Sequence, residues 1–201
     1  MKRYRTLRGL RRSRRYADRR LLLAAIGVVA VLWALHGPVL GAKLLPAQVV
    51  RVTDGDTIQV DVSGEGRRWV RIATIDAPEK GRRGAAGQPY AERSRQNLAR
   101  LVEHQPVRLM TLGQDDYGRI LARVRVRDAQ LAKEIDVGLA QICAGYAWLY
   151  EAYADSLTVA EQHEYRSCQN VARVEKRGLW RAPEPIPPWT WRHSRRGSVP
   201  R

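Results

Sequence analysis

Cysteine and histidine are scarce in this 201-residue chain, and their scarcity excludes two classes of small protein. There are two cysteines, Cys143 and Cys168, and four histidines. Two cysteines are too few for a disulfide-based scaffold, and they lack the clustered neighbours of a zinc site. No internal repeat is visible either. The length fits one ordinary domain with extensions, enough to bury a real core.

Acidic residues are also few relative to basic ones. The chain has 36 Lys and Arg against 20 Asp and Glu, a net charge of +16. Residues 1–20 hold ten of the basic residues and a single aspartate, whereas residues 43–201 hold 26 basic and 19 acidic residues. The part expected to fold is therefore moderately basic. This charge suits a polyanionic partner such as nucleic acid, although a solvated basic surface without a ligand would have the same composition.

The one long apolar run follows the arginine-rich start. Residues 21–35 contain no charge, and the apolar character continues through residue 42. A membrane-spanning helix needs about 20 such residues, and the core of a signal peptide about 7–15. We expect residues 21–42 to be a retained membrane anchor. A cleaved signal peptide is the alternative, and a buried globular helix is a third reading.

The arginines ahead of the apolar run fix its orientation. By the positive-inside rule residues 1–20 stay in the cytoplasm and everything after residue 42 is exported. A disulfide is permitted outside the cytoplasm, so Cys143 and Cys168 are a candidate pair. The alternative is two small buried residues in facing helices.

Two short acidic clusters lie within a predicted hairpin at residues 49–79. Apolar and polar residues alternate on either side of a turn at residues 63–66, and the clusters are Asp54-Gly55-Asp56-Thr57 and Asp76-Ala77-Pro78-Glu79. Asp56 is separated by an even number of positions from the apolar residues expected to face inward, so its side chain is expected to face inward as well. Strict alternation would place Arg71 and Asp76 on opposite faces, so the strand must bulge or end between them. Two carboxylate clusters can hold a hard cation, and an arginine beside them can neutralise a phosphate.

The rest of the chain predicts a small barrel with helices. Expected elements are a helix at residues 89–102, strands at 107–112 and 120–126, a helix at 131–144, a helix at 157–176 and a proline-rich tail without regular structure. We expect the tail's tryptophans to pack on the domain. Five strands, with a helix between the third and fourth and two helices after them, give an α+β fold: a five-stranded OB-type β-barrel with three helices, preceded by the N-terminal hydrophobic helix.

Six motifs occur in order from about residue 47 to residue 192. They are V-x-D-G-D-T-I, V-R-I-x-x-I-D-A-P-E, D-Y-G-R-x-L-A, A-G-Y-A-W, A-R-x-x-x-R-G-L-W and P-P-W-x-W-R. Together they resemble the staphylococcal nuclease (thermonuclease) family. The resemblance implies metal ligands at Asp56, Asp76 and the carbonyl of Ala77, a general base at Glu79, phosphate-binding arginines at Arg71 and Arg119, and a substrate contact at Tyr117. It also implies Ca²⁺ as the cofactor, with Mg²⁺ or Mn²⁺ as alternatives.

Each feature taken alone has an ordinary structural explanation. Asp-Gly is a common turn dipeptide, Arg71 could belong to a simple ion pair, and Glu79 could be a carboxylate at a helix N-terminus. The combination of these residues with Arg119 favours a catalytic site.

The sequence therefore predicts four segments and one activity. The segments are a basic cytoplasmic stretch (1–20), a membrane anchor or signal (21–42), a nuclease domain (43–182) and a basic Pro/Trp-rich tail (183–201). The expected activity is Ca²⁺-dependent hydrolysis of DNA and RNA, single-stranded or denatured, with low sequence selectivity and 3′-phosphate products. We expect a monomer, membrane-anchored on the extracytoplasmic side or else secreted or periplasmic. The alternatives are an exported OB-fold module that binds nucleic acid without cleaving it, and a cytoplasmic protein with a basic nucleic-acid-binding arm.

Overall fold

The computed structural model describes residues 44–81, 86–128 and 132–196. The apolar segment expected at residues 21–42 lies outside these ranges. Within them, no helix combines the length and apolar character needed to cross a membrane.

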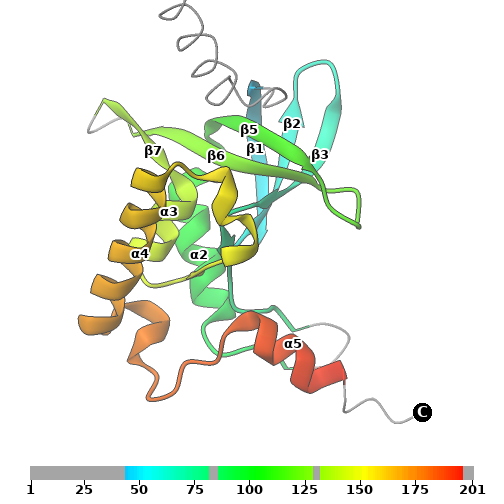
Figure 1. The fold of residues 1–201 in the computed structure, drawn as a ribbon. Coiled ribbons are helices and arrows are strands. Elements are labelled where there is room, and N and C mark those ends of the chain that lie inside the picture. The colour runs from blue at the N-terminus through cyan, green and yellow to red at the C-terminus, as the bar shows by residue number, and fades with distance from the viewer. Residues whose placement is uncertain (1–43, 82–85, 129–131, 197–201) are drawn as a thin grey trace, which may run out of the picture. The chain divides into compact units, whose positions relative to one another are not determined.

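Five strands close into a barrel, as the alternating pattern predicts (Figure 1). They are β1 (Leu44–Asp54), β2 (Thr57–Val62), β3 (Gly66–Ile72), β5 (Pro106–Gln114) and β6 (Ile120–Asp128). The order is β3-β2-β1-β5-β6 with antiparallel neighbours, and a parallel pairing of β3 with β6 closes the ring. The inward residues Ile58, Val60 and Val70 are fully buried, so alternation places the core inside the barrel. The OB-type barrel of the prediction is confirmed.

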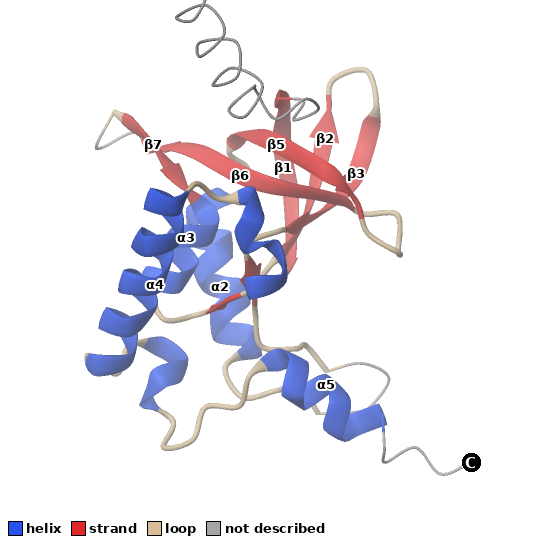
Figure 2. Cartoon of the chain, viewed as in Figure 1, coloured by secondary structure: helices blue, strands red, loops and turns tan. Residues whose placement is uncertain are grey.

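Helices and short strands complete the described part of the chain. The helices are α2 (Ala91–Val102), α3 (Val137–Cys143), α4 (Val159–Val174) and α5 (Pro188–Arg196), with single 3₁₀ segments at Glu151–Ser156 and Gly178–Arg181. The short strands are β4 (Ile75–Asp76), β7 (Lys133–Asp136) and β8 (Trp148–Leu149). Figure 2 shows α2, α3 and α4 grouped together and α5 apart from them.

The helix predicted at residues 131–144 is wrong in its first half. Lys133–Asp136 form β7, which pairs with β6 at its outer edge, and α3 begins only at Val137. Asp136 separates the two elements because its carboxylate accepts a hydrogen bond from the backbone N–H of Leu139 at 3.2 Å and so caps the helix. The apolar residues whose spacing predicted one helix are divided between two elements, β7 and α3.

The tail predicted to be irregular contains a helix. Pro188 is the first residue of α5, where a missing N–H and a fixed φ favour helix formation. The described residues therefore hold four α-helices rather than the three expected. Packing of the tail on the domain is confirmed for Trp189, whose ring lies 5.6 Å from that of Trp148.

The two cysteines are joined. A disulfide connects Cys143, the last residue of α3, to Cys168 in α4. Of the two readings left open by the sequence, the structure shows the bridge.

Candidate active site

The turn between β1 and β2 carries the first acidic residue of the site, Asp56. A Cβ on Gly55 would lie 1.9 Å from the hydroxyl oxygen of Ser94 in α2, so only glycine fits this approach. The fully buried amide of Gln141 in α3 donates a hydrogen bond to the carbonyl of Gly55 at 2.8 Å. Two helices thus hold the turn in place and present Asp56, which is itself buried.

Both oxygens of Asp56 are engaged by neighbouring groups. Its Oδ1 accepts from the hydroxyl of Thr57 at 3.0 Å, and its Oδ2 accepts from the backbone N–H of Ala77 at 2.9 Å. Burial, together with the charge of Asp56, raises the pKa of the nearby Asp54 to about 7. Asp54 therefore takes up a proton more readily than an ordinary aspartate, because a second negative charge beside Asp56 is unfavourable.

Arg71, near the end of β3, bridges the two acidic clusters. Its Nη1 lies 2.9 Å from Oδ2 of Asp56, and its Nη2 lies 2.9 Å from Oδ1 of Asp76. Nη1 also donates to the carbonyls of Ile72 and Ile75. β3 ends at Ile72 and β4 begins at Ile75, so the chain breaks strand geometry between Arg71 and Asp76, as the parity argument requires. Burial lowers the pKa of Arg71, but the aspartate charges outweigh it and the pKa is raised.

Asp76 and Glu79 share a second arginine, Arg192 of α5. Arg192 Nη1 donates to Oδ1 of Asp76 at 3.1 Å and to Oε1 of Glu79 at 2.6 Å, and Nη2 donates to Oδ2 of Asp76 at 2.9 Å. Burial raises the pKa of Asp76 above its usual range, against the opposing hydrogen bond from Arg192 and charge of Arg71. Gln88 holds the backbone of Glu79 through paired hydrogen bonds of 3.0 and 2.8 Å.

Sequence reasoning missed Arg192. The signal was present, because Arg192 ends the P-P-W-x-W-R motif. It was assigned to a tail without regular structure, and no local pattern links it to Asp76, 116 positions earlier.

The turn between β5 and β6 supplies Arg119 and Tyr117. Asp115 accepts from the backbone N–H groups of Tyr117 and Arg119 at 3.0 Å each, and from Nε of Arg119 at 2.7 Å. Burial opposes these bonds, yet they lower the pKa of Asp115. Nη1 of Arg119 donates to Thr57, the same hydroxyl that binds Asp56. Tyr117 is 82% exposed, with its ring 5.5 Å from the guanidinium of Arg119.

The residues predicted from the sequence therefore belong to one network of contacts. Arg119 joins it through Thr57, Arg71 bridges Asp56 and Asp76, and Arg192 adds Glu79. Ala77 contributes its backbone, and Tyr117 stands at the exposed edge beside Arg119. With Asp115, which holds Arg119, the network combines four carboxylates with three guanidinium groups, an arrangement suited to binding a cation and a phosphate together.

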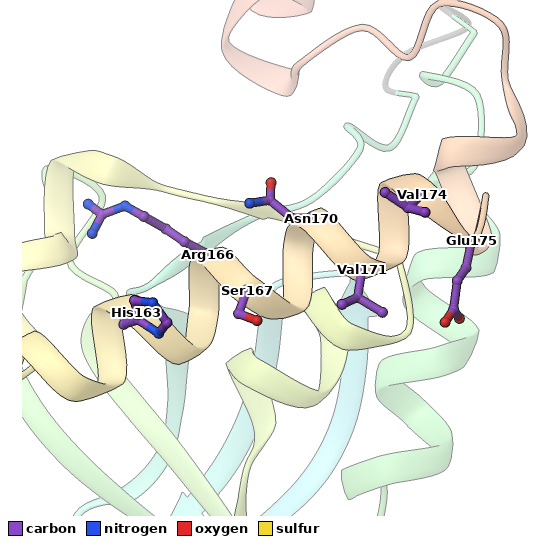
Figure 3. A pocket seen from close by; sticks show the side chains of 7 residues that line it. All are labelled: His163, Arg166, Ser167, Asn170, Val171, Val174 and Glu175. Carbon is purple, nitrogen blue, oxygen red and sulfur yellow. The ribbon is translucent and has the colours of Figure 1, made fainter.

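Two surface hollows differ in their relation to this network. One is lined in part by Lys80, Gln88, Tyr90 and Arg93, with the guanidinium of Arg93 5.5 Å from the ring of Tyr90, and its Gln88 is hydrogen-bonded to the backbone of Glu79. The other follows the outer side of α4, lined in part by His163, Ser167, Asn170 and Val171 (Figure 3). Neither hollow is lined by the acidic residues of the site themselves, but only the first has a lining residue, Gln88, that is bonded to one of them.

The family model described as "Staphylococcal nuclease homologue" matches residues 69–182. The chain belongs to the staphylococcal nuclease family. An "Uncharacterized endonuclease" of Escherichia coli is 39% identical to it over 163 residues, 81% of this chain and 94% of that protein. A "Micrococcal nuclease" of Shigella flexneri is 35% identical over 183 residues, 88% and 97% of the two chains. An "Uncharacterized endonuclease" of Haemophilus influenzae is 33% identical over 145 residues, covering 72% and 71%.

Membership of the staphylococcal nuclease family makes the chain a nuclease, a hydrolase of phosphodiester bonds. The family is metal-dependent in general. Asp56 and Arg192 both lie outside the residues that the family model matches.

Proposed function

We propose that this chain is a Ca²⁺-dependent nuclease that hydrolyses DNA and RNA with low sequence selectivity. The 5′-oxygen is the leaving group, so the products end in 3′-phosphates. The main support is the bridge made by Arg71, because one guanidinium contacts the carboxylates of both acidic clusters at 2.9 Å. A metal ion shared by Asp56 and Asp76 needs a position from which one positive charge contacts both carboxylates, and the guanidinium of Arg71 marks such a position.

The donor atoms at this place fit a hard cation. Asp56, Asp76 and the main-chain carbonyl of Ala77 would hold it through oxygen atoms alone, which favours Ca²⁺ and admits Mg²⁺ or Mn²⁺. Among the residues that the structure describes, no group of three or more His, Cys, Asp or Glu side chains is arranged to hold a metal. A site with two carboxylates thus relies on the main chain and water for its other ligands. When bound, the cation would stabilise negative charge developing on the phosphate.

The chain's own residues divide the remaining chemistry among them. Glu79 accepts the proton of the attacking water as general base. Arg71 and Arg119 donate hydrogen bonds to the phosphate oxygens, and their planar forks suit the charge that grows in the transition state. Asp115 fixes the direction of Arg119 by holding its Nε at 2.7 Å. Tyr117, exposed beside Arg119, contacts a neighbouring phosphate.

The surroundings of the site support a single-stranded or denatured substrate. An unpaired strand can bring its bases to aromatic side chains and its phosphates to basic ones. The hollow beside Glu79 offers this combination in Tyr90, Arg93 and Lys80. We propose that a monomer binds the strand there.

We also propose that the nuclease acts outside the cytoplasm. Residues 21–42 would anchor it in the membrane, with a secreted or periplasmic form after signal cleavage as the alternative. The disulfide between Cys143 and Cys168 supports this location, because such bonds persist in oxidising compartments.

Cleavage of denatured DNA by the full chain, purified in a nonionic detergent, tests the proposed activity. With millimolar Ca²⁺ the wild type should cleave, and excess chelator should stop it. Glu79→Gln, Arg71→Ala and Arg119→Ala should each lower the turnover by about 10²–10⁴-fold while the fold survives. Glu164→Gln and Arg181→Ala are matched controls at exposed positions and should cleave normally.

Two results would contradict the proposal. Absence of cleavage with Ca²⁺ would remove the enzymatic activity itself. The second result is DNA binding that weakens with salt, does not change with chelator and yields no cleavage products. It would indicate an OB-fold module that only binds nucleic acid.

A further inference from the structure

Arg192 makes the same kind of contact that a metal would make at this site. It donates to both oxygens of Asp76 and to Oε1 of Glu79, at 2.6 to 3.1 Å. Asp76 is fully buried, and its Oδ1 is also held by Arg71. Every oxygen of Asp76 is therefore in contact with a guanidinium group.

Arg192 is delivered by a helix that is anchored on the domain. The ring of Trp189 lies 5.6 Å from that of Trp148 and 6.4 Å from that of Tyr150. Just before α5, the carbonyl of Ile186 accepts a hydrogen bond from Gln88 at 2.6 Å, and Gln88 in turn holds the backbone of Glu79. The docking of α5 and the position of Glu79 are thus coupled through Gln88.

The charges of the site set up a competition. A divalent cation on Asp76 needs oxygen atoms that the guanidinium of Arg192 contacts, and two cations a few ångströms apart repel each other. The side chain of Arg192 is 35% exposed, so it can leave the carboxylates without crossing the core. Arg71 contacts Asp56 and Asp76 as well, but its guanidinium is also bonded to two backbone carbonyls, so Arg192 is the arginine that leaves the carboxylates more readily.

We propose that Arg192 is a built-in competitor of the metal, so that docking of its guanidinium on Asp76 and Glu79 and binding of a divalent cation oppose each other. The inference rests on the proposed metal site and adds its regulation. By thermodynamic linkage, whatever holds Arg192 in place weakens cation binding, and a bound cation weakens the hold on Arg192 by the same factor. The C-terminal helix thereby sets the cation concentration at which the nuclease becomes active.

Calorimetric titration of the full chain in detergent with Ca²⁺, after removal of metal by a chelator, tests this inference. Arg192→Met should lower the Kd for Ca²⁺ by roughly five-fold or more. Arg192→Gln, which keeps hydrogen-bond donors without the charge, should do the same and serves as the second variant if the first does not fold. Arg181→Met removes one positive charge from an exposed position and should leave the Kd unchanged, which separates local competition from a change in net charge.

Thermal unfolding supplies a second measurement that does not depend on activity. Without metal, Arg192→Met should unfold at a lower temperature than wild type, because Asp76 loses a partner. Saturating Ca²⁺ should raise the unfolding temperature of the variant more than that of the wild type.

The outcomes separate this inference from the proposed function. Equal or weaker Ca²⁺ binding by both Arg192 variants would overturn the competition and leave the metal site standing. Loss of cleavage with an unchanged Kd would likewise overturn it and make Arg192 a residue of catalysis alone. Absence of Ca²⁺ binding in wild type and variants alike would instead contradict the metal site.

Discussion

Gly55 shows how a single residue without a side chain positions the acidic turn. A Cβ at this position would lie 1.9 Å from Oγ of Ser94 and 2.7 Å from Cβ of Ala77. Gly55→Ala should therefore push the turn away from α2, lower the free energy of unfolding by about 1–3 kcal/mol and weaken cleavage by displacing Asp56. Chemical denaturation and a cleavage assay measure the two effects.

Gly66 is the matched control for Gly55. Its φ is +69° and a Cβ there would meet no atom within 4 Å. Asparagine tolerates this conformation, so Gly66→Asn should cost less than about 1 kcal/mol and leave cleavage unchanged. If Gly55→Ala proved as mild as the control, the close packing of the turn against α2 would not matter for the site.

The sequence allowed the paired acids and Arg71 to be placed together, but it did not reveal Arg192. Strand parity required a break between Arg71 and Asp76, and the structure has one after Ile72. That inference used residues five apart, within reach of local rules. Arg192 meets Glu79 across 113 positions. Only the tertiary docking of α5 brings them together, and local periodicity carries no information about such contacts.

At the scale of elements, the start of α4 is tied to the barrel by one carboxylate. Glu161 forms a capping box with Thr158, and it pairs with the buried Arg123 of β6 at 2.5 Å. Burial opposes these contacts, yet the hydrogen bonds from Arg123 lower the pKa of Glu161 to about 2 from a usual 4.5. Glu161→Gln should lower the free energy of unfolding at pH 6 by about 2–3 kcal/mol.

The pH dependence of this loss has a definite sign. A carboxyl whose folded pKa is depressed stabilises the protein above its unfolded pKa, and this contribution disappears as the pH falls through the folded value. The difference between wild type and Glu161→Gln should be constant above about pH 4.5 and fall to roughly half or less by pH 3. Urea titrations at pH 6 and pH 3 measure it. A difference that grows on acidification would contradict the pairing with Arg123.

The predicted secondary structure was correct where one hydrophobic pattern corresponded to one element. Alternation placed the five barrel strands because each buries one face in a common core. It failed at residues 133–143, where β7 and α3 follow each other with only the cap at Asp136 between them. It also failed at α5, whose prolines come at and before the first turn rather than within the helix. In both cases the start of the helix is marked by a particular residue, Asp136 as the cap of α3 and Pro188 as the first residue of α5, and not by hydrophobic periodicity.

At the scale of the whole molecule, the helices on one side of the barrel support the acidic turn, and the disulfide fastens two of them. Gln141 of α3 reaches Gly55, and Cys143 at the end of the same helix is bonded to Cys168 of α4. The cross-link therefore restrains the layer that supports the site. It spans 25 positions of sequence, so in the chain-entropy view it should stabilise the fold by about 3 kcal/mol.

Replacing both cysteines by serine tests this contribution without leaving a lone thiol. The double variant should unfold at lower denaturant concentration than the oxidised wild type, by the equivalent of about 3 kcal/mol, yet still cleave at 25 °C because neither cysteine touches the acidic network. Reductant should bring the wild type to the level of the variant and leave the variant unchanged. Equal stability of all three forms would show that the cross-link adds nothing. If it does add stability, the nuclease has its full stability only in an oxidising compartment, where such bonds persist.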